Sequence, residues 1–223
     1  MIGLFGGTFD PPHLGHIHLI KTLCSQFTFS SFYLIPNFQN PLKQRGPQIS
    51  PDQRLELLQT AITDLGNQVR ILDWEIKNPE PSYTIDTLQR FLKTVSEPTV
   101  FILGDECFSQ LRRWKSPREL LLLTNWIVVK RNEEIMKISS QMLHDLNIKD
   151  TRWIHSHHLA YSQDRNWIRF CDIEALPYSS TQIRNSLVEA WKKNTLDNPP
   201  QGIQRSVWLM IKEKRLYSVG ESK

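Results

Sequence analysis

Cysteine is scarce in this chain of 223 residues, and the three cysteines that occur are widely spaced. Cys24, Cys107 and Cys171 form no C-x-x-C pair, the spacing that is typical of zinc sites and redox motifs. They are odd in number and lie in or beside apolar segments, which predicts buried free thiols. The pattern therefore argues against a disulfide-stapled scaffold and against a cysteine zinc centre.

Long hydrophobic runs are also missing. No stretch of about eighteen apolar residues occurs, so the sequence offers no candidate membrane span. Apolar residues make up 39% of the chain and charged residues 22%, as in globular proteins. Met1 begins an apolar run directly, which leaves no room for a signal peptide. We therefore expect a cytoplasmic protein that does not bind membranes.

A strong excess of one charge is the third absence. The chain has 27 basic and 23 acidic residues, a net charge of +4 with histidine neutral. Such a modest excess suits a polyphosphate substrate as well as it suits a nucleic acid. Composition alone does not decide between the two.

The most informative stretch is the beginning, MIGLFGGTFDPPHLGHIH. The apolar residues 1–5 are followed by Gly6 and Gly7, then by a proline-containing loop and a segment of helical period. Glycine lets the backbone turn sharply and approach a ligand, and the first turn of a helix presents N–H groups to anions. His13 and His16, three positions apart, share one helix face. The stretch predicts a phosphate site with histidine donors and no serine or cysteine nucleophile.

Each of these features alone is also compatible with a plain strand, a turn and two surface histidines. The segments that follow favour a βαβ unit, because residues 17–27 have helical period and residues 30–36 form a short strand. A dinucleotide-binding Rossmann domain begins in the same way, but it needs G-x-G-x-x-G and an acidic residue after the second strand. This chain has GLFGG and Asn37 at those places, so a redox NAD site is disfavoured.

The segment GGTFDPPHLGH resembles the GxFDPxHxGH motif of the nucleotidylyltransferase superfamily, in the form found in bacterial nicotinate mononucleotide adenylyltransferases. The resemblance implies an α/β fold, Rossmann-like and doubly wound, with a mainly parallel sheet. It implies one domain of 223 residues whose C-terminal part, from about 179, is helical. In that family the two histidines bind the nucleotide phosphates and stabilise the pentavalent phosphorus. The implied catalytic residues are His16 and His13, and the implied phosphate loop contains Gly6, Gly7, Thr8 and Phe9.

A second motif, SSTQIR at residues 179–184, resembles the SSTxIR motif of the same superfamily. Ser179 or Ser180 is expected to cap a helix that begins near Thr181, with N–H groups and the Arg184 guanidinium available to phosphate. Ser180, Thr181 and Arg184 are therefore predicted to bind ATP. The alternative is a capped helix with a purely structural role.

The loop of residues 37–50 is polar, proline-broken and basic. Lys43 takes the place of the lysine in the family's PPHK segment and is a candidate contact of the β- or γ-phosphate. The alternative is a solvated loop lysine. Arg54, on the helix predicted over residues 51–65, matches an arginine of the family that we expect to be structural.

Two further segments narrow the substrate. SYTIDTL, residues 82–88, resembles the family's SYTxDTL motif, which implies that Tyr83 and Thr84 bind nicotinate mononucleotide. Ser82 or Thr84 is expected to cap the helix predicted over residues 85–94. Trp114 matches a tryptophan on a loop that faces this motif in relatives, and its ring can form a cation–π contact with a pyridinium ring.

A continuous apolar run at residues 98–103 predicts a buried central strand that ends in Gly104, Asp105 and Glu106. A carboxylate there can hold ribose hydroxyls or order water on Mg²⁺. The family pattern is Gly-x-Asp, which puts Glu106 in the functional place. The choice between the two carboxylates therefore stays open.

Elsewhere the pattern predicts a third strand at residues 69–72, a strand at 125–130, a helix at 133–146, two edge strands within 152–170 and an amphipathic helix at 202–217. His155, His157 and His158 lie in the segment least similar to the family. They are disfavoured as metal ligands because no cysteine or acidic partner has suitable spacing.

The resemblance implies that the protein joins ATP and nicotinate mononucleotide to give nicotinate adenine dinucleotide and pyrophosphate, by direct in-line attack on the α-phosphate. Mg²⁺ is expected with ATP, and no metal site on the protein. The partners are the two substrates, without nucleic acid or membrane, and assembly into a homo-oligomer is left open. The alternatives are a nicotinamide mononucleotide or phosphopantetheine adenylyltransferase, a cytidylyltransferase, and a non-catalytic nucleotide-sensing or RNA-binding module.

Overall fold

The computed structural model describes residues 1–130, 134–155, 158–161 and 165–218. The chain divides into two compact units, each assembled from segments far apart in the sequence. The first unit contains Met1–Gly6, Phe29–Ile35 and Ser82–Glu174, and the second contains Gly7–Thr28, Pro36–Pro81 and Ala175–Lys223. A single domain over the whole chain stays a prediction.

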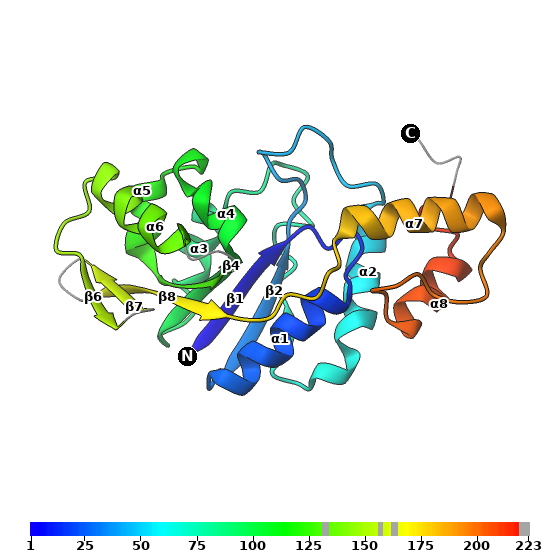
Figure 1. The fold of residues 1–223 in the computed structure, drawn as a ribbon, viewed down its shortest axis with the longest axis horizontal. Coiled ribbons are helices and arrows are strands. Elements are labelled where there is room, and N and C mark those ends of the chain that lie inside the picture. The colour runs from blue at the N-terminus through cyan, green and yellow to red at the C-terminus, as the bar shows by residue number, and fades with distance from the viewer. Residues whose placement is uncertain (131–133, 156–157, 162–164, 219–223) are drawn as a thin grey trace. The chain divides into compact units, whose positions relative to one another are not determined.

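The first unit is built on a sheet in which strands β2-β1-β4-β5-β8-β7-β6 are neighbours in that order (Figure 1). The strands are β1 (Ile2–Gly7), β2 (Ser31–Pro36), β4 (Thr99–Gly104), β5 (Asn125–Lys130), β6 (Arg152–His155), β7 (His158–Tyr161) and β8 (Asn166–Asp172). Strands β1, β4, β5 and β8 pair in parallel, whereas β7 and β6 extend the sheet in antiparallel fashion. The predicted α/β, Rossmann-like fold with a mainly parallel sheet is confirmed.

The centre of this sheet is β4, whose residues 99–103 are all buried. In the register, Phe5 of β1 lies opposite Ile102, and Gly104 lies opposite Val129 of β5. The carboxyl ends of these parallel strands therefore lie at the same edge of the sheet. Ligands of open α/β sheets bind at that edge.

Four helices and one turn of 3₁₀ helix complete the first unit. They are α3 (Thr84–Phe91), α4 (Asp105–Ser109), η2 (Leu111–Arg113), α5 (Pro117–Leu123) and α6 (Glu134–Asp145). Helix α3 packs beside α5, and α4 packs on β4, β5 and α6. Within the described part of the chain, no helix is long and apolar enough to cross a membrane.

Three predictions for the first unit are wrong. The N-cap position of helix α3 falls on Tyr83, which makes no side-chain cap, and not on Ser82 or Thr84. Residues 152–170 hold parts of three strands and not two, since β8 also lies there and pairs with β5. Of the three cysteines expected to be buried, Cys107 on helix α4 is exposed and Cys24 is half-buried, whereas Cys171 on β8 is buried.

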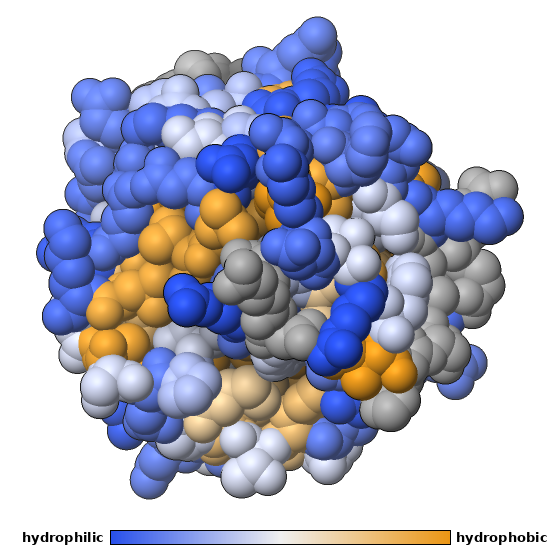
Figure 2. All heavy atoms as spheres, turned by 90° about the vertical axis from the view of Figure 1, so that its left-hand side faces the viewer, coloured by the Kyte–Doolittle hydropathy of each residue, from blue (hydrophilic) through white to orange (hydrophobic). Residues whose placement is uncertain are grey.

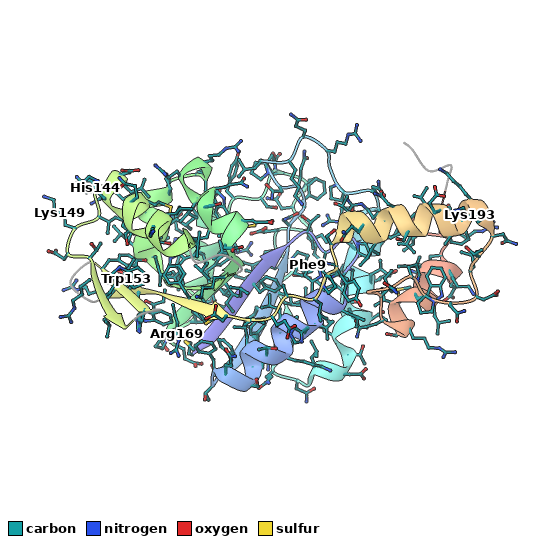
Figure 3. The ribbon with its side chains drawn as sticks, viewed as in Figure 1. Phe9, His144, Lys149, Trp153, Arg169 and Lys193 are labelled. Carbon is teal, nitrogen blue, oxygen red and sulfur yellow. The ribbon has the colours of Figure 1, made fainter. Side chains whose placement is uncertain are left out.

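The outer edge of the sheet carries exposed hydrophobic side chains. Trp153 and Ile154 on β6 are 40% and 43% exposed. The ring of Trp153, labelled in Figure 3, lies 5.7 Å from the ring of Phe170 on β8. Figure 2 shows hydrophobic atoms gathered in patches between hydrophilic ones on the face that looks toward the viewer there.

The second unit consists mainly of helices and has one short strand. Its elements are α1 (Leu14–Gln26), α2 (Pro51–Ile62), η1 (Thr63–Leu65), β3 (Val69–Ile71), α7 (Ser180–Lys193) and α8 (Arg205–Glu213). Helix α1 buries Ile17, Ile20 and Leu23 on one face, as its sequence period predicts. Helix α2 begins at a capping box formed by Ser50 and Gln53.

The last helix packs on α2. The Gln204 side chain donates to the Ala61 carbonyl at 3.1 Å, and Lys214 pairs with Glu56. Helix α8 starts at Arg205, later than the 202 expected from sequence. The reason is Gly202, which has a φ of +89° and therefore cannot belong to a right-handed helix. The predicted helical C-terminal part is present as α7 and α8.

Candidate active site

The loop between β1 and α1 is held in a strained conformation. Phe9 has a φ of +48°, a left-handed backbone that is costly for a bulky side chain, and its side chain is 1% exposed. A Cβ on Gly7 would come within 2.8 Å of the Phe9 ring. The same ring meets the His16 ring edge-on, at 5.0 Å between centroids (Figure 3 labels Phe9). Gly7 and Phe9 thus fix the turn that leads into α1.

His13 and His16 form a stacked pair at the start of α1. Their ring centroids are 3.7 Å apart, with 30° between the planes. Nδ1 of His16 accepts a hydrogen bond from the backbone N–H of His13 at 3.2 Å. A neutral imidazole that accepts at Nδ1 carries its proton on Nε2. Nε2 of His16 is therefore the donor that this geometry offers to a ligand.

The electrostatic surroundings favour the same protonation state. Burial, and secondarily the neighbouring His13, hold the pKa of His16 well below its usual range. The ring is consequently neutral at pH 7. A neutral N–H donor can stabilise negative charge that develops on a phosphate oxygen without giving up its proton.

The glycine between the two histidines has a steric role. A Cβ at Gly15 would lie 2.9 Å from Nδ1 and 3.0 Å from Cε1 of His13. The ring of His13, 8% exposed, could keep its place only if that Cβ were absent. The spacing of the H-x-G-H motif therefore follows from the packing of His13 over Gly15.

One expectation for this turn needs correction. The sequence predicted unpaired N–H groups at the first turn of α1. The N–H of Leu14 instead donates to the Gly202 carbonyl at 2.8 Å, and that of His16 turns back to the His13 carbonyl at 2.9 Å. Both amides are used within the protein, so the imidazoles are the better candidates for anion contacts.

Asp10 is a buried carboxylate, 3% exposed, in the middle of the phosphate loop. Its Oδ1 accepts from the Tyr217 hydroxyl at 2.7 Å, and its Oδ2 accepts from the Gln48 backbone N–H at 2.9 Å. Nη1 of Arg184 lies 3.7 Å from Oδ2. Sequence reasoning missed Asp10 and Tyr217. The available signal was an acidic residue inside a loop predicted to bind phosphate, which requires partners that neutralise it.

The SSTQIR segment is joined to this loop. Ser179 caps α7 by accepting from the Gln182 N–H at 3.3 Å, and the Ser180 hydroxyl donates to the Pro11 carbonyl at 3.0 Å. Arg184 donates from Nη1 to the Asp10 carbonyl at 2.6 Å and from Nη2 to Thr181 Oγ1 at 3.1 Å. The two predicted phosphate motifs, 174 residues apart at Asp10 and Arg184, are thus brought together within the second unit.

Arg184 is held by protein groups on both of its terminal nitrogens, yet it is not fully satisfied. Its Nε is buried and has no hydrogen-bond partner among the described residues. A buried N–H without a partner is destabilising by about 1–3 kcal/mol.

Arg54 has the structural role that we expected. It is 1% exposed and donates to the carbonyls of Thr8, Asn37 and Phe38 at 2.9, 2.7 and 3.0 Å. These bonds tie the phosphate loop to the start of the loop that follows β2. Lys43 lies in that second loop and is exposed, on a turn closed by its N–H and the Asn40 carbonyl. Its phosphate contact stays a prediction.

The residues predicted to bind the pyridine nucleotide belong to the first unit. Lys115 Nζ lies 2.8 and 2.9 Å from the two carboxylate oxygens of Asp86 and 4.9 Å from the centre of the Tyr83 ring. Trp114 is half-buried and meets the Phe101 ring edge-on at 6.5 Å. The SYTIDTL segment and the Trp114-Lys115 loop are therefore in contact, as predicted, through Lys115.

The carboxylates after β4 differ in exposure. Asp105 is 8% exposed and accepts from the Glu106 N–H at 2.9 Å, whereas Glu106 is exposed. The exposed group is the one that the family's Gly-x-Asp pattern favours. The choice between the two carboxylates stays a prediction.

The predicted site residues thus fall into two groups. The first unit contains the predicted nucleotide contacts Gly6, Tyr83, Thr84, Gly104, Asp105, Glu106 and Trp114. The second unit contains Gly7, Thr8, Phe9, His13, His16, Lys43, Ser180, Thr181 and Arg184. Of the three histidines weighed as metal ligands, His155 and His158 lie on β6 and β7, and His157 lies outside the described residues. Over the described ranges, no three His, Cys, Asp or Glu side chains are placed to hold a metal ion.

Comparison with known proteins identifies the family of the chain. The cytidylyltransferase-like family model matches residues 4–186. A protein of Leptospira borgpetersenii serovar Hardjo-bovis named "Probable nicotinate-nucleotide adenylyltransferase" is 31% identical over 223 residues, which covers 98% of this chain and 97% of that protein. A protein of the same name from Aquifex aeolicus is 36% identical over 137 residues, or 60% of this chain and 80% of the relative.

Solved structures show the same fold. The nicotinic acid mononucleotide adenylyltransferase of Plasmodium falciparum, in its complex with NaAD, is 16% identical with a TM-score of 0.66 and covers 97% of this chain and 96% of its own. At that identity the likeness concerns the fold alone. The family match over residues 4–186 and the full-length Leptospira relative carry the assignment. The chain belongs to the cytidylyltransferase-like family and, within it, to the nicotinate-nucleotide adenylyltransferases.

Proposed function

We infer that the protein transfers the adenylyl group of ATP to nicotinate mononucleotide, giving nicotinate adenine dinucleotide and pyrophosphate. The observation that carries this inference is that two predicted phosphate motifs are hydrogen-bonded to each other. Arg184 of the SSTQIR segment donates to the Asp10 carbonyl, and Ser180 donates to the Pro11 carbonyl. The named relatives of the chain support the choice of substrate.

The reaction needs no covalent intermediate on the protein. The phosphate of the mononucleotide is already a nucleophile, and it attacks the α-phosphorus of ATP in line. The protein contributes positioning and charge stabilisation. We assign to His16 the donation of its Nε2 proton in a hydrogen bond to an α-phosphate oxygen, and to His13 the support of that ring from 3.7 Å.

The departing pyrophosphate requires cations. Arg184 is one candidate, because its guanidinium is bonded to the phosphate loop at Asp10. Lys43 is the other, because it is exposed on a loop whose start is tied to the phosphate loop by Arg54. We also propose that Ser180 and Thr181 bind the phosphates at the N-terminal end of α7. Gly6, Gly7, Thr8 and Phe9 let the backbone pass close to the phosphates.

Mg²⁺ is proposed to arrive with ATP. Among the described residues, no group of three His, Cys, Asp or Glu side chains is placed to hold a metal ion. The Asp10 carboxylate in particular already accepts from Tyr217 and Gln48. We therefore assign the ion to the triphosphate and route no step through a protein-bound metal.

For the acceptor we propose Tyr83, Thr84 and Trp114, with an exposed carboxylate at Glu106 or the buried one at Asp105 for ribose hydroxyls. Trp114 can place its electron-rich face on the pyridinium ring. We further propose that the reaction takes place in the cytoplasm, in keeping with the sequence.

A panel of acceptors tests this function. Pyrophosphate release from ATP is measured with nicotinate mononucleotide, nicotinamide mononucleotide and phosphopantetheine, and from CTP with nicotinate mononucleotide. The proposal predicts that kcat/KM is highest for ATP with nicotinate mononucleotide. Faster turnover with phosphopantetheine or CTP would place the chain with another branch of the family, and binding of ATP without turnover in any pair would make it a nucleotide-binding module.

A further inference from the structure

Tyr217 lies beyond the last helix, and the reaction described above assigns it no task. Its backbone has a φ of +60°, in the left-handed region, and its side chain is 5% exposed. A tyrosine held in this strained conformation brings its hydroxyl to 2.7 Å from Asp10 Oδ1. Tyr217 is thus joined to the phosphate loop by a side-chain hydrogen bond.

That bond forms part of a chain of contacts. Asp10 accepts from Tyr217 on Oδ1 and from the Gln48 N–H on Oδ2, and Nη1 of Arg184 lies 3.7 Å from Oδ2. The same Nη1 donates to the Asp10 backbone carbonyl at 2.6 Å. Asp10 therefore holds the guanidinium of Arg184 by a hydrogen bond to its backbone carbonyl, and its carboxylate lies near the same nitrogen.

The charges in this cluster set its behaviour. Burial, followed by the neighbouring Asp10, raises the pKa of Tyr217 well above its usual range, so the hydroxyl keeps its proton and remains a donor. The guanidinium of Arg54 also interacts favourably with the Asp10 carboxylate. Tyr217 is therefore a neutral donor on a carboxylate that is otherwise surrounded by an amide and two guanidinium groups.

We propose that Tyr217 is a positioning residue for the ATP phosphates: its hydroxyl fixes Asp10, and Asp10 holds the guanidinium of Arg184. The proposal deepens the function proposed above and rests on it for the identity of the ligand. Without the hydroxyl, Asp10 keeps its charge but loses one donor, and the ion pair with Arg184 can rearrange. The KM for ATP should then rise, and the KM for nicotinate mononucleotide should stay unchanged.

The test is Tyr217→Phe, with Tyr161→Phe as the matched control. Tyr161 is also a fully buried tyrosine, and its hydroxyl donates to the Leu121 carbonyl at 2.7 Å in the first unit. Both variants lose one buried hydroxyl. We expect Tyr217→Phe to raise the KM for ATP about tenfold, the loss expected for one hydrogen bond to a charged group. Tyr161→Phe should leave both KM values unchanged, as should Tyr217→Phe for nicotinate mononucleotide.

Two further variants separate positioning from folding. Asp10→Asn keeps the shape of the side chain but weakens its hold on Arg184, and it should reproduce the higher KM for ATP even if Tyr217→Phe fails to fold. In an Arg184→Lys background, Tyr217→Phe should add less than about a twofold change, because the path ends at the guanidinium. Equal increases in both KM values, or an undiminished effect in the Arg184→Lys background, would overturn the proposal.

Binding of α,β-methylene ATP, measured by calorimetry, separates this proposal from the function on which it rests. Weaker binding by Tyr217→Phe in a protein that forms no dinucleotide would support the positioning role and count against the proposed reaction. Normal turnover with unchanged binding in Tyr217→Phe would overturn the positioning role alone. If the wild-type chain did not bind the analogue, both would be wrong.

Discussion

The ring of His13 lies so close to Gly15 that a Cβ on the glycine would come within 2.9 Å of Nδ1. Real Cβ contacts are not found at that distance, so the ring would have to move. Because His13 and His16 are stacked at 3.7 Å, a displacement of one ring disturbs the other. The small residue in the middle of the motif is thus a requirement of the histidine pair.

From this contact we predict that Gly15→Ala lowers kcat by about tenfold or more, since misplacement of a catalytic group by about 1 Å can cost as much as a hundredfold. Gly46→Ala is the matched control, because nothing lies within 4 Å of a Cβ at that glycine. Steady-state kinetics of pyrophosphate release compare the two variants. Equal kcat values for Gly15→Ala and wild type would show that the packing of His13 does not matter.

Stability should depend on pH through His16. Its pKa is lowered in the folded state by burial and by His13, whereas in the unfolded chain it is near 6.5. As pH falls from about 7.5 to about 5.5, the unfolded chain takes up a proton that the folded chain does not. The free energy of unfolding should therefore decrease, by up to about 1 kcal/mol from this residue.

Urea denaturation of the wild type, His16→Gln and His18→Gln at the two pH values measures this contribution. His18 is a second half-buried histidine on the same helix and serves as the control. His16→Gln should show a smaller loss of stability on acidification than either of the others. The same loss in His16→Gln as in the wild type would remove His16 as the source.

Local features of the fold could be predicted from the sequence. Strand and helix positions were predictable because the apolar period is local: residues 125–130 form β5 as predicted, and α1 buries its predicted face. The stacking of His13 on His16 is also local, three residues apart. Such features need no knowledge of the rest of the fold.

Contacts between distant segments were not predictable in this way. The hydrogen bond from Tyr217 to Asp10 and that from Leu14 to Gly202 each join the N-terminal loop to the C-terminal part. The two residues of each pair are too far apart in the sequence for hydrophobic periodicity to indicate that they are in contact. The burial of Cys107 was predicted from its apolar neighbours and was wrong, because a helix of five residues has too little pattern to assign a face.

The acceptor site leads to a prediction on KM. Trp114→Ala should raise the KM for nicotinate mononucleotide by a factor of roughly 2 to 30, the range of a cation–π contact, and should leave the KM for ATP unchanged. Trp114→Phe should restore part of the affinity. Trp153→Ala removes a tryptophan that is 40% exposed on β6 and serves as the control. A larger effect on ATP than on the mononucleotide would contradict the assignment.

Thiol reactivity should follow exposure. Cys107 is exposed, whereas burial raises the pKa of Cys171 to about 11 and that of half-buried Cys24 by a smaller amount. A thiolate is the reactive form, so iodoacetamide at neutral pH should modify Cys107 first. Peptide mapping after brief treatment identifies the modified residue. Loss of the rapid phase is expected in Cys107→Ser, and faster labelling of Cys171 would disagree with the structure.

His16, at the start of α1, is proposed to stabilise the transition state of adenylyl transfer. The most direct measurement is the rate of nicotinate adenine dinucleotide formation from ATP and nicotinate mononucleotide, identified by mass, in the wild type, His16→Ala and His18→Ala. We expect one dinucleotide per pyrophosphate in the wild type and, in His16→Ala, a kcat lower by a factor on the order of 10² to 10³, the scale of a lost transition-state donor. His18→Ala should retain the wild-type rate. Near-normal dinucleotide formation by a folded His16→Ala protein would contradict the claim.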